Sequence, residues 1–587
     1  MSTRNRALRL WLPLLLAALA CNLLVPGVSP APVDAVSTQP APAGSTLPAP
    51  PAAAPPSPPE HRIAIRTVNG TAEFFDRQTG ARFVPRGAAL WRWRWNDQNQ
   101  QAVIDTIFNT STFGQLDNAL EELPKMRADG FNTVHLWFNA CWGGATGCLD
   151  QPAGGLNRGF LQNMARFLQV AKDNGIYAIL TMDALPDSSQ YQGLLNPYRG
   201  RFESFNLEFM SQGGVDAQAK YQTDLIRGLM EVGAPMDAIL AYQIKEEAYF
   251  ETDQPPLNAT SGEVTPANGR TYSLADPTQR RALMEDSWLY YISQVTTAIK
   301  TVEPTALVTM GFFVQQEPNP VLVGDPRFVY MHKVLNESAL DFVSFSAYPG
   351  YDLTMKQTAE NFDLIGYNAK PVVMGEYGAD KRNYADLETA AMALQAWQVA
   401  SCEFGFDGWE MWYWGGGDIH FEFWEALEGD GAIRRALSPV RNPDPCAPGE
   451  EMRTYRNMAT FKPVRASATH DALHAAEYAV DLSMKTHWNA GANPPNWIEI
   501  DLQQPSTIGA IRLPALQDQT GFTRHRILGK GESGDYQVLH EFSGVTQDGQ
   551  WLEYRPSPPL EGIRWVRIET LKSPSWVAWQ EIEILRP

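Results

Sequence analysis

Cysteine and clustered basic residues are both scarce in this chain. Five cysteines in 587 residues are too few for a small disulfide-stapled scaffold. Lysine and arginine number 47 against 66 aspartate and glutamate residues, for a formal charge of −19, and no basic run occurs beyond the N-terminus. Because binding to nucleic acid requires clustered cations to neutralise phosphates, the sequence predicts no nucleic-acid partner.

Apolar and aromatic residues, by contrast, are plentiful. Apolar residues make up 44% of the chain and charged residues only 19%, which excludes general disorder. The length exceeds that of one ordinary domain, and at about 150 residues per domain it indicates two to four. The 18 tryptophans suggest exposed aromatic surface as well as core.

The first 21 residues have the pattern of an export signal. Arg4, Arg6 and Arg9 precede an apolar stretch, residues 10–20, that is too short to span a bilayer. The small residues Ala18 and Ala20 resemble a signal-peptidase site, and Cys21 after them resembles the lipidated cysteine of a bacterial lipoprotein. An uncleaved membrane anchor is the alternative. We therefore expect a protein that is secreted or tethered to the outer cell surface, with membrane contact only through a lipid on Cys21.

Residues 22–60 are rich in proline and alanine and form a predicted linker. Such a stretch cannot bury a core and favours extended polyproline II, so it would act as a semi-rigid spacer. The remaining cysteines fit an oxidising compartment. We expect the bridges Cys141–Cys148 and Cys402–Cys446, although spacing alone does not fix the connectivity.

Short apolar runs alternate with amphipathic stretches over residues 61–440. One clear helical face, at Leu161, Met164, Leu168 and Ala171, ends at Asn174-Gly175. Eight strands are predicted at residues 83–88, 133–138, 176–182, 238–244, 306–311, 342–345, 371–374 and 408–412. This pattern favours an α/β fold, a (β/α)8 TIM barrel with long loops. A doubly wound open sheet is the alternative, and the lack of a glycine-rich phosphate loop after the first strand argues against it.

Polar and aromatic side chains follow the predicted strands, where the chemistry of such a barrel is located. In chain order they are Trp91, Trp93, Trp95, Asn139, Trp142, Asp183, Glu246, Glu247, Tyr348, Glu376, Trp412 and Trp414. Two carboxylates across a barrel mouth, among flat aromatic rings, suit the cleavage of a glycosidic bond. One acid protonates the leaving oxygen, and the other attacks or stabilises the sugar centre.

Two of these segments, YQIKEEAYF (242–250) and KPVVMGEYG (370–378), resemble the fourth- and seventh-strand motifs of clan A glycoside hydrolases. The likeness is greatest to family 5, the cellulase and mannanase type. PRGAALW (85–91), FNTVHLW (131–137), DFVSFSAYPG (341–350) and GFDGWEMWYW (405–414) support it. The resemblance implies Glu247 as acid/base, Glu376 as nucleophile, and retention of anomeric configuration. It also implies that Tyr348 contacts the nucleophile and that the ring of Trp412 or Trp414 forms the floor of the subsite where cleavage occurs.

The chain departs from this family at three positions. Glu246 stands where the family has an asparagine that contacts the sugar 2-hydroxyl, His135 replaces an arginine, and Ser346 replaces a histidine. Arg86 is the candidate for the missing positive charge beside Glu376. Substrate preference therefore cannot be copied from cellulases, and Glu246 leaves open which glutamate is the acid.

The remaining substrate-binding candidates have competing interpretations. We expect His135 to be a hydrogen-bonded pocket residue, because no second histidine stands at ligand spacing. Asp183 either lines the pocket or caps the next segment. Together with Trp142, Glu246, Tyr348, Arg86 and the two tryptophans of the eighth strand, they complete the expected sugar site, for which no catalytic cofactor is expected.

The proton affinities of Glu247 and Glu376 must differ for this chemistry. An ionised Glu376 at about 5–5.5 Å would raise the pKa of Glu247 and keep it protonated. Glu246 would raise that pKa further if it faced the pocket. Because successive strand residues point to opposite faces, only one of Glu246 and Glu247 need face the reaction if the chain stays extended there.

The pattern changes after a proline-rich break, and we expect a linker at 441–452 and a second domain at 453–587. Ile498, Ile500 and Leu502 alternate with Glu499 and Asp501, which is typical of a half-buried strand. Several such short strands between turns predict an antiparallel β-sandwich.

This region, from NMATFKPVRAS (457–467) to SPSWVAWQEIEI (573–584), resembles a discoidin, or factor 5/8 type C, domain. Its bacterial relatives are family 32 carbohydrate-binding modules. The resemblance implies sugar binding at loop tips, with Trp576, Arg524 and His474 as candidates. It also implies a structural calcium site at Asp481, Thr486 and Glu581, which Leu482 for glycine and Ser483 for aspartate weaken. A spacer without ligand is the alternative.

Two classes of function follow. The first is an exported retaining glycoside hydrolase that cleaves an oligo- or polysaccharide by double displacement, with an appended carbohydrate-binding module. The second is a non-catalytic cell-surface carbohydrate-binding protein with a degenerate barrel. In either case we expect a monomer whose partner is carbohydrate.

Overall fold

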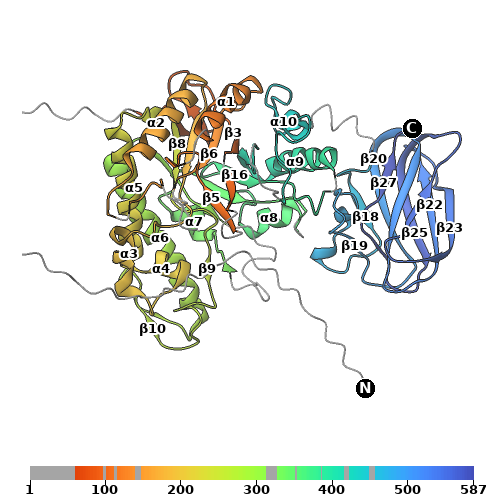
Figure 1. Ribbon diagram of the computed structural model, residues 1–587. Helices are drawn as coiled ribbons and strands as arrows, with labels where there is room; N and C mark the ends of the chain where they lie inside the picture. Colours follow the sequence, from red (N-terminus) through yellow and green to blue (C-terminus); the bar gives the residue numbers. More distant parts are fainter. Residues whose placement is uncertain are drawn as a thin grey trace, which may run out of the picture. The chain divides into compact units, whose positions relative to one another are not determined.

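The computed structural model describes residues 60–90, 92–96, 101–111, 115–138, 147–151, 153–312, 327–350, 353–384, 386–415, 422–447 and 457–587 (Figure 1). For residues 92–96, 101–105 and 115 it describes the backbone only. The predictions on Cys21, Trp91, Asn139, Cys141 and Trp142 lie outside the described residues, as do the signal and nearly all of the linker at 22–60. Those predictions stay untested.

Nine strands form one parallel sheet in the order β12-β8-β7-β6-β3-β17-β16-β15-β13. Their bounds are β3 (Arg86–Ala89), β6 (Thr133–Trp137), β7 (Tyr177–Thr181), β8 (Ile239–Gln243), β12 (Leu307–Thr309), β13 (Gly311–Phe312), β15 (Val343–Ser346), β16 (Val372–Tyr377) and β17 (Phe406–Met411). Only Met310 separates β12 from β13, so these two are one interrupted strand. It pairs with β8 on one side and with β15 on the other. The sheet therefore closes into the predicted eight-stranded barrel.

Helices follow the barrel strands and lie outside them (Figure 1). They are α1 (Gln115–Ala128), α2 (Arg158–Asp173), α3 (Ser189–Leu195), α4 (Ser204–Met210), α5 (Gln212–Glu231), α6 (Pro277–Val302), α7 (His332–Glu337), α8 (Met355–Asn361), α9 (Leu387–Ser401) and α10 (Ala432–Leu437). In α2 the Asn157 side chain accepts hydrogen bonds from the N–H groups of Gly159 and Phe160, which satisfies donors that no helical carbonyl reaches. The predicted apolar face of α2 is buried.

A hairpin that the sequence analysis did not predict packs against the start of the barrel strands. It consists of β1 (Ile63–Val68) and β2 (Thr71–Asp76). Ile63 and Phe74 are buried in one cluster with side chains from the first residues of the barrel strands: Tyr177, Leu240, Leu307, Phe342 and Val373. The hairpin therefore closes the amino-terminal end, and the carboxyl end remains for a site. Two further antiparallel strand pairs lie in the loops: β4 (Arg92–Asn96) with β5 (Gln101–Asp105), and β10 (Glu263–Val264) with β11 (Tyr272–Ser273).

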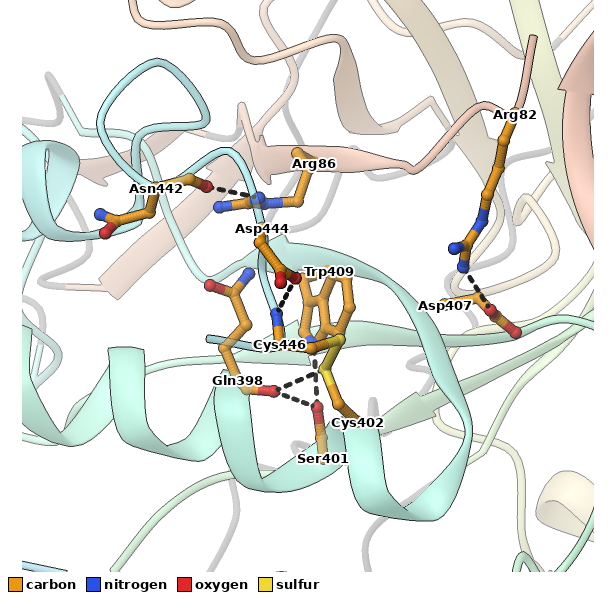
Figure 2. The surroundings of a disulfide bond; sticks show 10 residues. All are labelled: Arg82, Arg86, Gln398, Ser401, Cys402, Asp407, Trp409, Asn442, Asp444 and Cys446. Atoms are coloured by element: carbon orange, nitrogen blue, oxygen red, sulfur yellow. Dashed lines mark hydrogen bonds and ion pairs between the residues drawn. A yellow bond between two sulfur atoms is a disulfide. The ribbon is translucent and has the colours of Figure 1, made fainter. Parts of the chain in front are cut away.

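The predicted disulfide Cys402–Cys446 is present, with a Cα–Cα distance of 5.6 Å. It ties the residue after α9 to the segment that follows α10 (Figure 2). Nearby, the Trp409 indole N–H donates to Ser401 Oγ at 2.9 Å. Among the residues described, no helix is both long and apolar enough to cross a membrane.

The C-terminal region is antiparallel throughout, as predicted. Its strands are β18 (Val464–Ala466), β19 (Trp488–Asn489), β20 (Asn496–Ile508), β21 (Ala510–Leu516), β22 (Gly521–Lys530), β23 (Gln537–Thr546), β24 (Trp551–Tyr554), β25 (Leu560–Lys572), β26 (Ala578–Trp579) and β27 (Glu583–Leu585). They form two sheets, β18-β20-β25-β22-β23 and β19-β26-β21-β24, with β27 beside β21. Ile498, Ile500, Val566 and Ile568 lie in one buried cluster between them. The expected β-sandwich is confirmed.

Candidate active site

Glu376 lies near the carboxyl end of β16 and is held by a neighbouring tyrosine. The Tyr348 hydroxyl donates to Glu376 Oε2 at 2.5 Å, and Glu376 is only 6% exposed. Tyr348 follows β15, the adjacent strand. The contact that the family resemblance implied between these two side chains is therefore present.

Glu246 and Glu247 both approach this carboxylate, because the chain does not stay extended after β8. The strand ends at Gln243, and Glu247 has a φ of 43°, in the left-handed region that side chains rarely adopt. The alternation of faces therefore ends before the two glutamates. Glu246 Oε2 accepts a hydrogen bond from the Gln243 amide and lies 3.4 Å from His135 Nε2.

Four carboxyl groups, those of Asp183, Glu246, Glu247 and Glu376, share this end of the barrel, and the charge of Glu246 opposes the ionisation of the other three. Burial raises the pKa of Glu247 to about 8, with the charges of Glu246 and Asp183 adding to it, against Arg327 and Ser346. Burial also raises the pKa of Glu376 well above its usual value, and the charges of Glu246 and Glu247 add to this. The Tyr348 hydroxyl works in the opposite direction. The expected rise for Glu247 is present, but its causes are led by burial and the charges of Glu246 and Asp183 rather than by Glu376.

Asp183 belongs to this group of carboxyls, so the pocket interpretation is favoured over that of a cap. It follows β7 directly after Met182. Burial raises the pKa of Asp183, Lys245 lowers it, and Glu246 and Glu208 raise it. Its charge therefore acts on the same site as the two glutamates of the fourth strand.

His135 is a fully buried pocket residue, as expected. Its Nδ1 lies 3.2 Å from the Gly375 carbonyl oxygen, and its Nε2 contacts the Thr181 hydroxyl. The ring stacks on Trp137 with centroids 4.1 Å apart. In the described part of the chain, no group of three or more histidine, cysteine, aspartate or glutamate side chains is arranged to hold a metal ion.

Trp412 contributes to an aromatic cluster beside Tyr348. Trp412, Trp137 and Tyr413 are buried together, and Tyr348 and Phe423 pack against them. The rings of Trp137 and Trp412 meet edge to face at 5.4 Å. This cluster could present an apolar face to a sugar at the same end of the barrel as Glu376.

The expectation for Trp414 is wrong. Its side chain is fully buried, its indole N–H donates to Glu122 Oε2 on α1 at 3.1 Å, and its ring meets Phe131 edge-on at 5.3 Å. The side chain therefore faces the helical layer instead of the site, because the chain has left the strand three residues earlier, at Met411.

The expectation for Arg86 is also wrong. Its guanidinium donates to the Leu437 carbonyl oxygen at 2.8 Å and to the Asn442 carbonyl oxygen at 3.2 Å (Figure 2). Arg86 is the first residue of β3, whereas Glu376 is near the end of β16. The arginine secures the chain after α10. The cation that lowers the pKa of Glu247 is instead Arg327, in β14 (Arg327–Phe328).

The sequence analysis missed Arg327 and Lys245. Lys245 stands two residues before Glu247 in a buried run, and its side chain is 0% exposed. A lysine inside an apolar strand end was a usable signal, because lysine is almost never fully buried unless paired. Arg327 gave no comparable signal. It reaches the site through the pairing of β14 with β9 (Phe250–Glu251), which no local pattern predicts.

The C-terminal sandwich has a small, partly open pocket beside an exposed tryptophan, Trp576. Gln517, His525, Thr570 and Trp579 also line it. His525 Nδ1 lies 3.0 Å from Thr570 Oγ1, and burial lowers the pKa of His525 to about 4, so the ring is neutral at neutral pH. The other two candidates do not line this pocket: Arg524 pairs with Glu541 and His474 contacts Asp471.

The three calcium candidates are brought together in the sandwich. Asp481 accepts hydrogen bonds from the Thr486 hydroxyl at 2.6 Å and the Ser483 N–H at 2.9 Å. Glu581 Oε2 accepts from the Leu482 N–H at 3.1 Å, while Oε1 is buried without a hydrogen-bond partner. Burial and the charge of Asp481 raise the pKa of Glu581. An orphaned carboxylate oxygen beside a second carboxylate is an arrangement that a cation would satisfy.

A closed parallel barrel, with carboxylates and aromatic rings at the carboxyl end of its strands, defines the TIM-barrel class. The pattern of the Cellulase (glycosyl hydrolase family 5) family matches residues 96–417, more than half of the chain, and the chain belongs to this family. An F5/8 type C domain matches residues 463–583. No curated protein has a significant match to the chain.

Solved structures match the two parts of the chain separately. The endo-1,4-β-mannanase of Rhizomucor miehei is 16% identical, covers 64% of this chain and 98% of its own, and has a TM-score of 0.44. The exo-β-1,4-mannosidase Op5Man5 of Opitutaceae bacterium strain TAV5 is 16% identical, covers 65% and 58%, and has a TM-score of 0.39. A chitosan-binding module of a Paenibacillus sp. IK-5 chitosanase/glucanase is 22% identical over 22% of this chain and 98% of its own, with a TM-score of 0.20.

Proposed function

We propose that this protein is an exported retaining glycoside hydrolase that cleaves O-glycosidic bonds of an oligo- or polysaccharide. The observation that carries the proposal is the convergence of Glu247 and Glu376. The two side chains come from the fourth and seventh barrel strands, yet the charge of Glu247 acts on Glu376 in a buried site.

In the first step of the proposed reaction, Glu247 donates its proton to the glycosidic oxygen while Glu376 attacks the anomeric carbon. The C–O bond to the leaving group breaks, and a covalent ester to Glu376 forms. The pKa of Glu247 at about 8 keeps it protonated at neutral pH, as a general acid requires.

In the second step, Glu247, now ionised, takes a proton from water, and the water oxygen displaces Glu376 from the anomeric carbon. Two inversions give net retention. The Tyr348 hydroxyl supports this step because its hydrogen bond to Glu376 stabilises the leaving carboxylate.

Glu246 gives the proposed site an unusual charge. As a third carboxyl beside the reacting pair, it raises the pKa of both, so the pair titrates as a unit. We expect a bell-shaped pH profile whose acidic limb lies above the ordinary range of a glutamate and whose basic limb lies near pH 8.

For the sandwich we propose carbohydrate binding at the pocket beside Trp576. An exposed aromatic ring next to buried polar groups can stack on a sugar and hydrogen-bond its hydroxyls. His525 Nε2, which is buried without a hydrogen-bond partner, supports this role. We expect Trp576→Ala to weaken glycan binding at least about tenfold in a glycan-array or calorimetric titration of the full chain, with Trp551→Ala, an exposed tryptophan outside the pocket, as the control.

We also propose that Asp481, Thr486 and Glu581 hold a structural calcium ion, which would balance the charge of the two carboxylates. Chelation should then lower the melting temperature, and Glu581→Gln should abolish that dependence. An unchanged melting temperature on adding EDTA and then excess calcium would contradict this assignment.

The function is tested with a panel of aryl glycosides and the variants Glu376→Ala and Glu247→Gln. We expect wild-type turnover of at least one sugar and a loss of at least about 1,000-fold in each variant. Glu360→Gln, at an exposed surface pair with Lys356, is the matched control. Azide, as an external nucleophile, should restore turnover to Glu376→Ala and form a glycosyl azide of inverted configuration.

Glycan binding without turnover of any sugar by the wild type would support the second candidate, a carbohydrate-binding protein with a degenerate barrel. The departures at His135, Glu246 and Ser346 are what favour that candidate. Turnover that survives both catalytic substitutions would contradict the assignment of Glu247 and Glu376.

A further inference from the structure

Lys245 is a fully buried lysine within the proposed site, and the reaction described above does not use it. Its side chain is 0% exposed, and it stands between the end of β8 and Glu247. Its carbonyl oxygen accepts a hydrogen bond from the Gly311 N–H at 2.8 Å, so its backbone is fixed to the neighbouring strand. A buried ammonium is costly unless it is paired, and its partners show what it holds.

The Lys245 ammonium joins three elements. It donates to the main-chain carbonyl oxygen of Asp183 after β7. It lies 3.3 Å from Glu208 Oε2 and 4.2 Å from the centroid of the Phe205 ring. Phe205 and Glu208 stand three residues apart on α4, so both lie on one face of that helix. Lys245 therefore fastens the ends of β7 and β8 to α4.

Helix α4 also contacts the segment that follows Glu247, the proposed acid/base residue. The Asn206 side chain donates to the Glu251 carbonyl oxygen at 2.8 Å and accepts from the Glu251 N–H at 3.0 Å. Phe205 meets the Tyr249 ring edge-on at 4.7 Å. Glu247 is thus bracketed by Lys245 on one side and by residues bound to α4 on the other.

We infer that Lys245 is a positioning residue for Glu247: it anchors the strand end that carries Glu247 to the Asp183 main chain after β7 and to Glu208 on α4. The inference rests on the proposed function, because it assigns Glu247 as the acid/base. It adds a residue that acts through its neighbours and touches no substrate.

The electrostatics of the site support this role. Lys245 lowers the pKa of Asp183, and the charge of Asp183 raises the pKa of Glu247. The other groups that act on these two carboxyls are Glu246, Glu376, Glu208, Arg327, Tyr249 and Ser346. Loss of the Lys245 charge would favour the neutral form of Asp183, and this would weaken the repulsion between Asp183 and an ionised Glu247.

The test is the basic limb of the pH profile of kcat/KM in Lys245→Met, Asp183→Asn and the double variant. We expect Lys245→Met to move this limb to lower pH by about one unit, the size typical of a neighbouring charge. Asp183→Asn should move it in the same direction. In the double variant the limb should lie where Asp183→Asn alone places it, because both changes act through one carboxylate.

Controls separate this role from a general structural one. Lys220→Met removes a half-buried lysine that pairs with Asp224 on α5 and should leave the limb in place. Lys245→Arg keeps the charge and should retain the wild-type limb. An unmoved limb in Lys245→Met, a further shift in the double variant, or an arginine variant that behaves like methionine would each overturn the inference.

If Lys245→Met does not fold, Lys245→Gln, which removes the charge but keeps a donor for the Asp183 carbonyl oxygen, replaces it under the same criteria. Titration of ¹³C-labelled glutamate carboxyls by NMR reads Glu247 without any substrate, with Glu247→Gln identifying its signal. An inactive wild type would contradict the proposed function, whereas a Glu247 titration unaffected by Lys245→Met or by Asp183→Asn would contradict the role of Lys245 alone.

Discussion

The two ends of the barrel both bury ionisable side chains, but they surround them with opposite kinds of partner. At the amino end, His61 Nε2 lies 2.7 Å from Glu303 Oε1, and the Tyr242 hydroxyl donates to Glu303 Oε2 at 2.7 Å. All three side chains are at most 1% exposed. At the carboxyl end, burial and the charge of Glu246 raise the pKa values of Asp183, Glu247 and Glu376.

This difference distinguishes buried ionisable groups that stabilise the fold from those that serve the proposed chemistry. A buried charge with a matched partner can be tolerated, and removing one partner is strongly destabilising. Buried groups of the same sign destabilise the fold at neutral pH and acquire the shifted pKa values that acid–base chemistry uses. We therefore expect changes at the amino end to affect stability and changes at the carboxyl end to affect catalysis.

The largest effect on stability is expected for Glu303→Gln. It leaves His61 and the Tyr242 hydroxyl with a weaker partner in a fully buried site, and the free energy of unfolding should fall by about 3 to 5 kcal/mol. Urea unfolding measures this change. Glu360→Gln, at an exposed pair, should cost less than about 1 kcal/mol.

In the same variant, kcat/KM of the folded protein should stay within about twofold of the wild type. A stability loss no greater than that of Glu360→Gln, or a large loss of kcat/KM, would contradict the division between the two ends.

A change of pH profile is expected for Glu246→Gln. The charge of Glu246 raises the pKa of both Glu247 and Glu376, so its removal should move both limbs of the kcat/KM profile to lower pH, by about one unit. Both limbs are measured on one substrate. If neither limb moves, Glu246 does not act on the reacting pair.

The same repulsion should appear in the pH dependence of stability. The folded pKa of Glu247 is about 8 against an ordinary value of 4.5. The folded state therefore keeps a proton that the unfolded state releases, and this contribution to stability falls as pH rises from about 4.5 to 8. Thermal unfolding across this range should show a smaller decline in Glu246→Gln than in the wild type. An equal decline would contradict the repulsion.

The smallest effect is expected from the two neighbouring tryptophans. Trp412→Phe should raise KM several-fold with little loss of stability, because Trp412 lies in the aromatic cluster beside Tyr348. Trp414→Phe removes the indole N–H that donates to Glu122 and should cost about 1 to 2 kcal/mol with KM unchanged. Kinetics and urea unfolding of both variants decide this, and the reverse pattern would place Trp414 in the site.

The sequence predicted the barrel well because buried parallel strands appear as continuous apolar runs. The order of these runs then indicated which residues follow each strand, and Glu376, Tyr348 and Asp183 were found in this way. Local pattern could not give the direction of a side chain once a strand had ended, and Trp414 was misplaced for this reason.

Long-range partners were the other source of error. Arg86 was expected at the site, but its guanidinium binds carbonyl oxygens about 350 residues further along the chain. Arg327 reaches Glu247 only because β14 pairs with β9. The joint approach of Glu246 and Glu247 depended on a left-handed residue, which no rule of strand alternation anticipates.

The most direct test of the account is to trap the covalent intermediate. The reagent is a 2-deoxy-2-fluoro glycoside with an activated leaving group, made for the sugar that the panel identifies. The fluorine slows both steps of the reaction, but the activated leaving group keeps the first step fast enough for the covalent intermediate to accumulate. Peptide mass spectrometry should then find the fluorosugar on Glu376, with Glu247→Gln retaining the label. A label on Glu246 or Glu247, or hydrolysis with inversion of the anomeric carbon, would contradict the claim that Glu376 and Glu247 share one sugar centre.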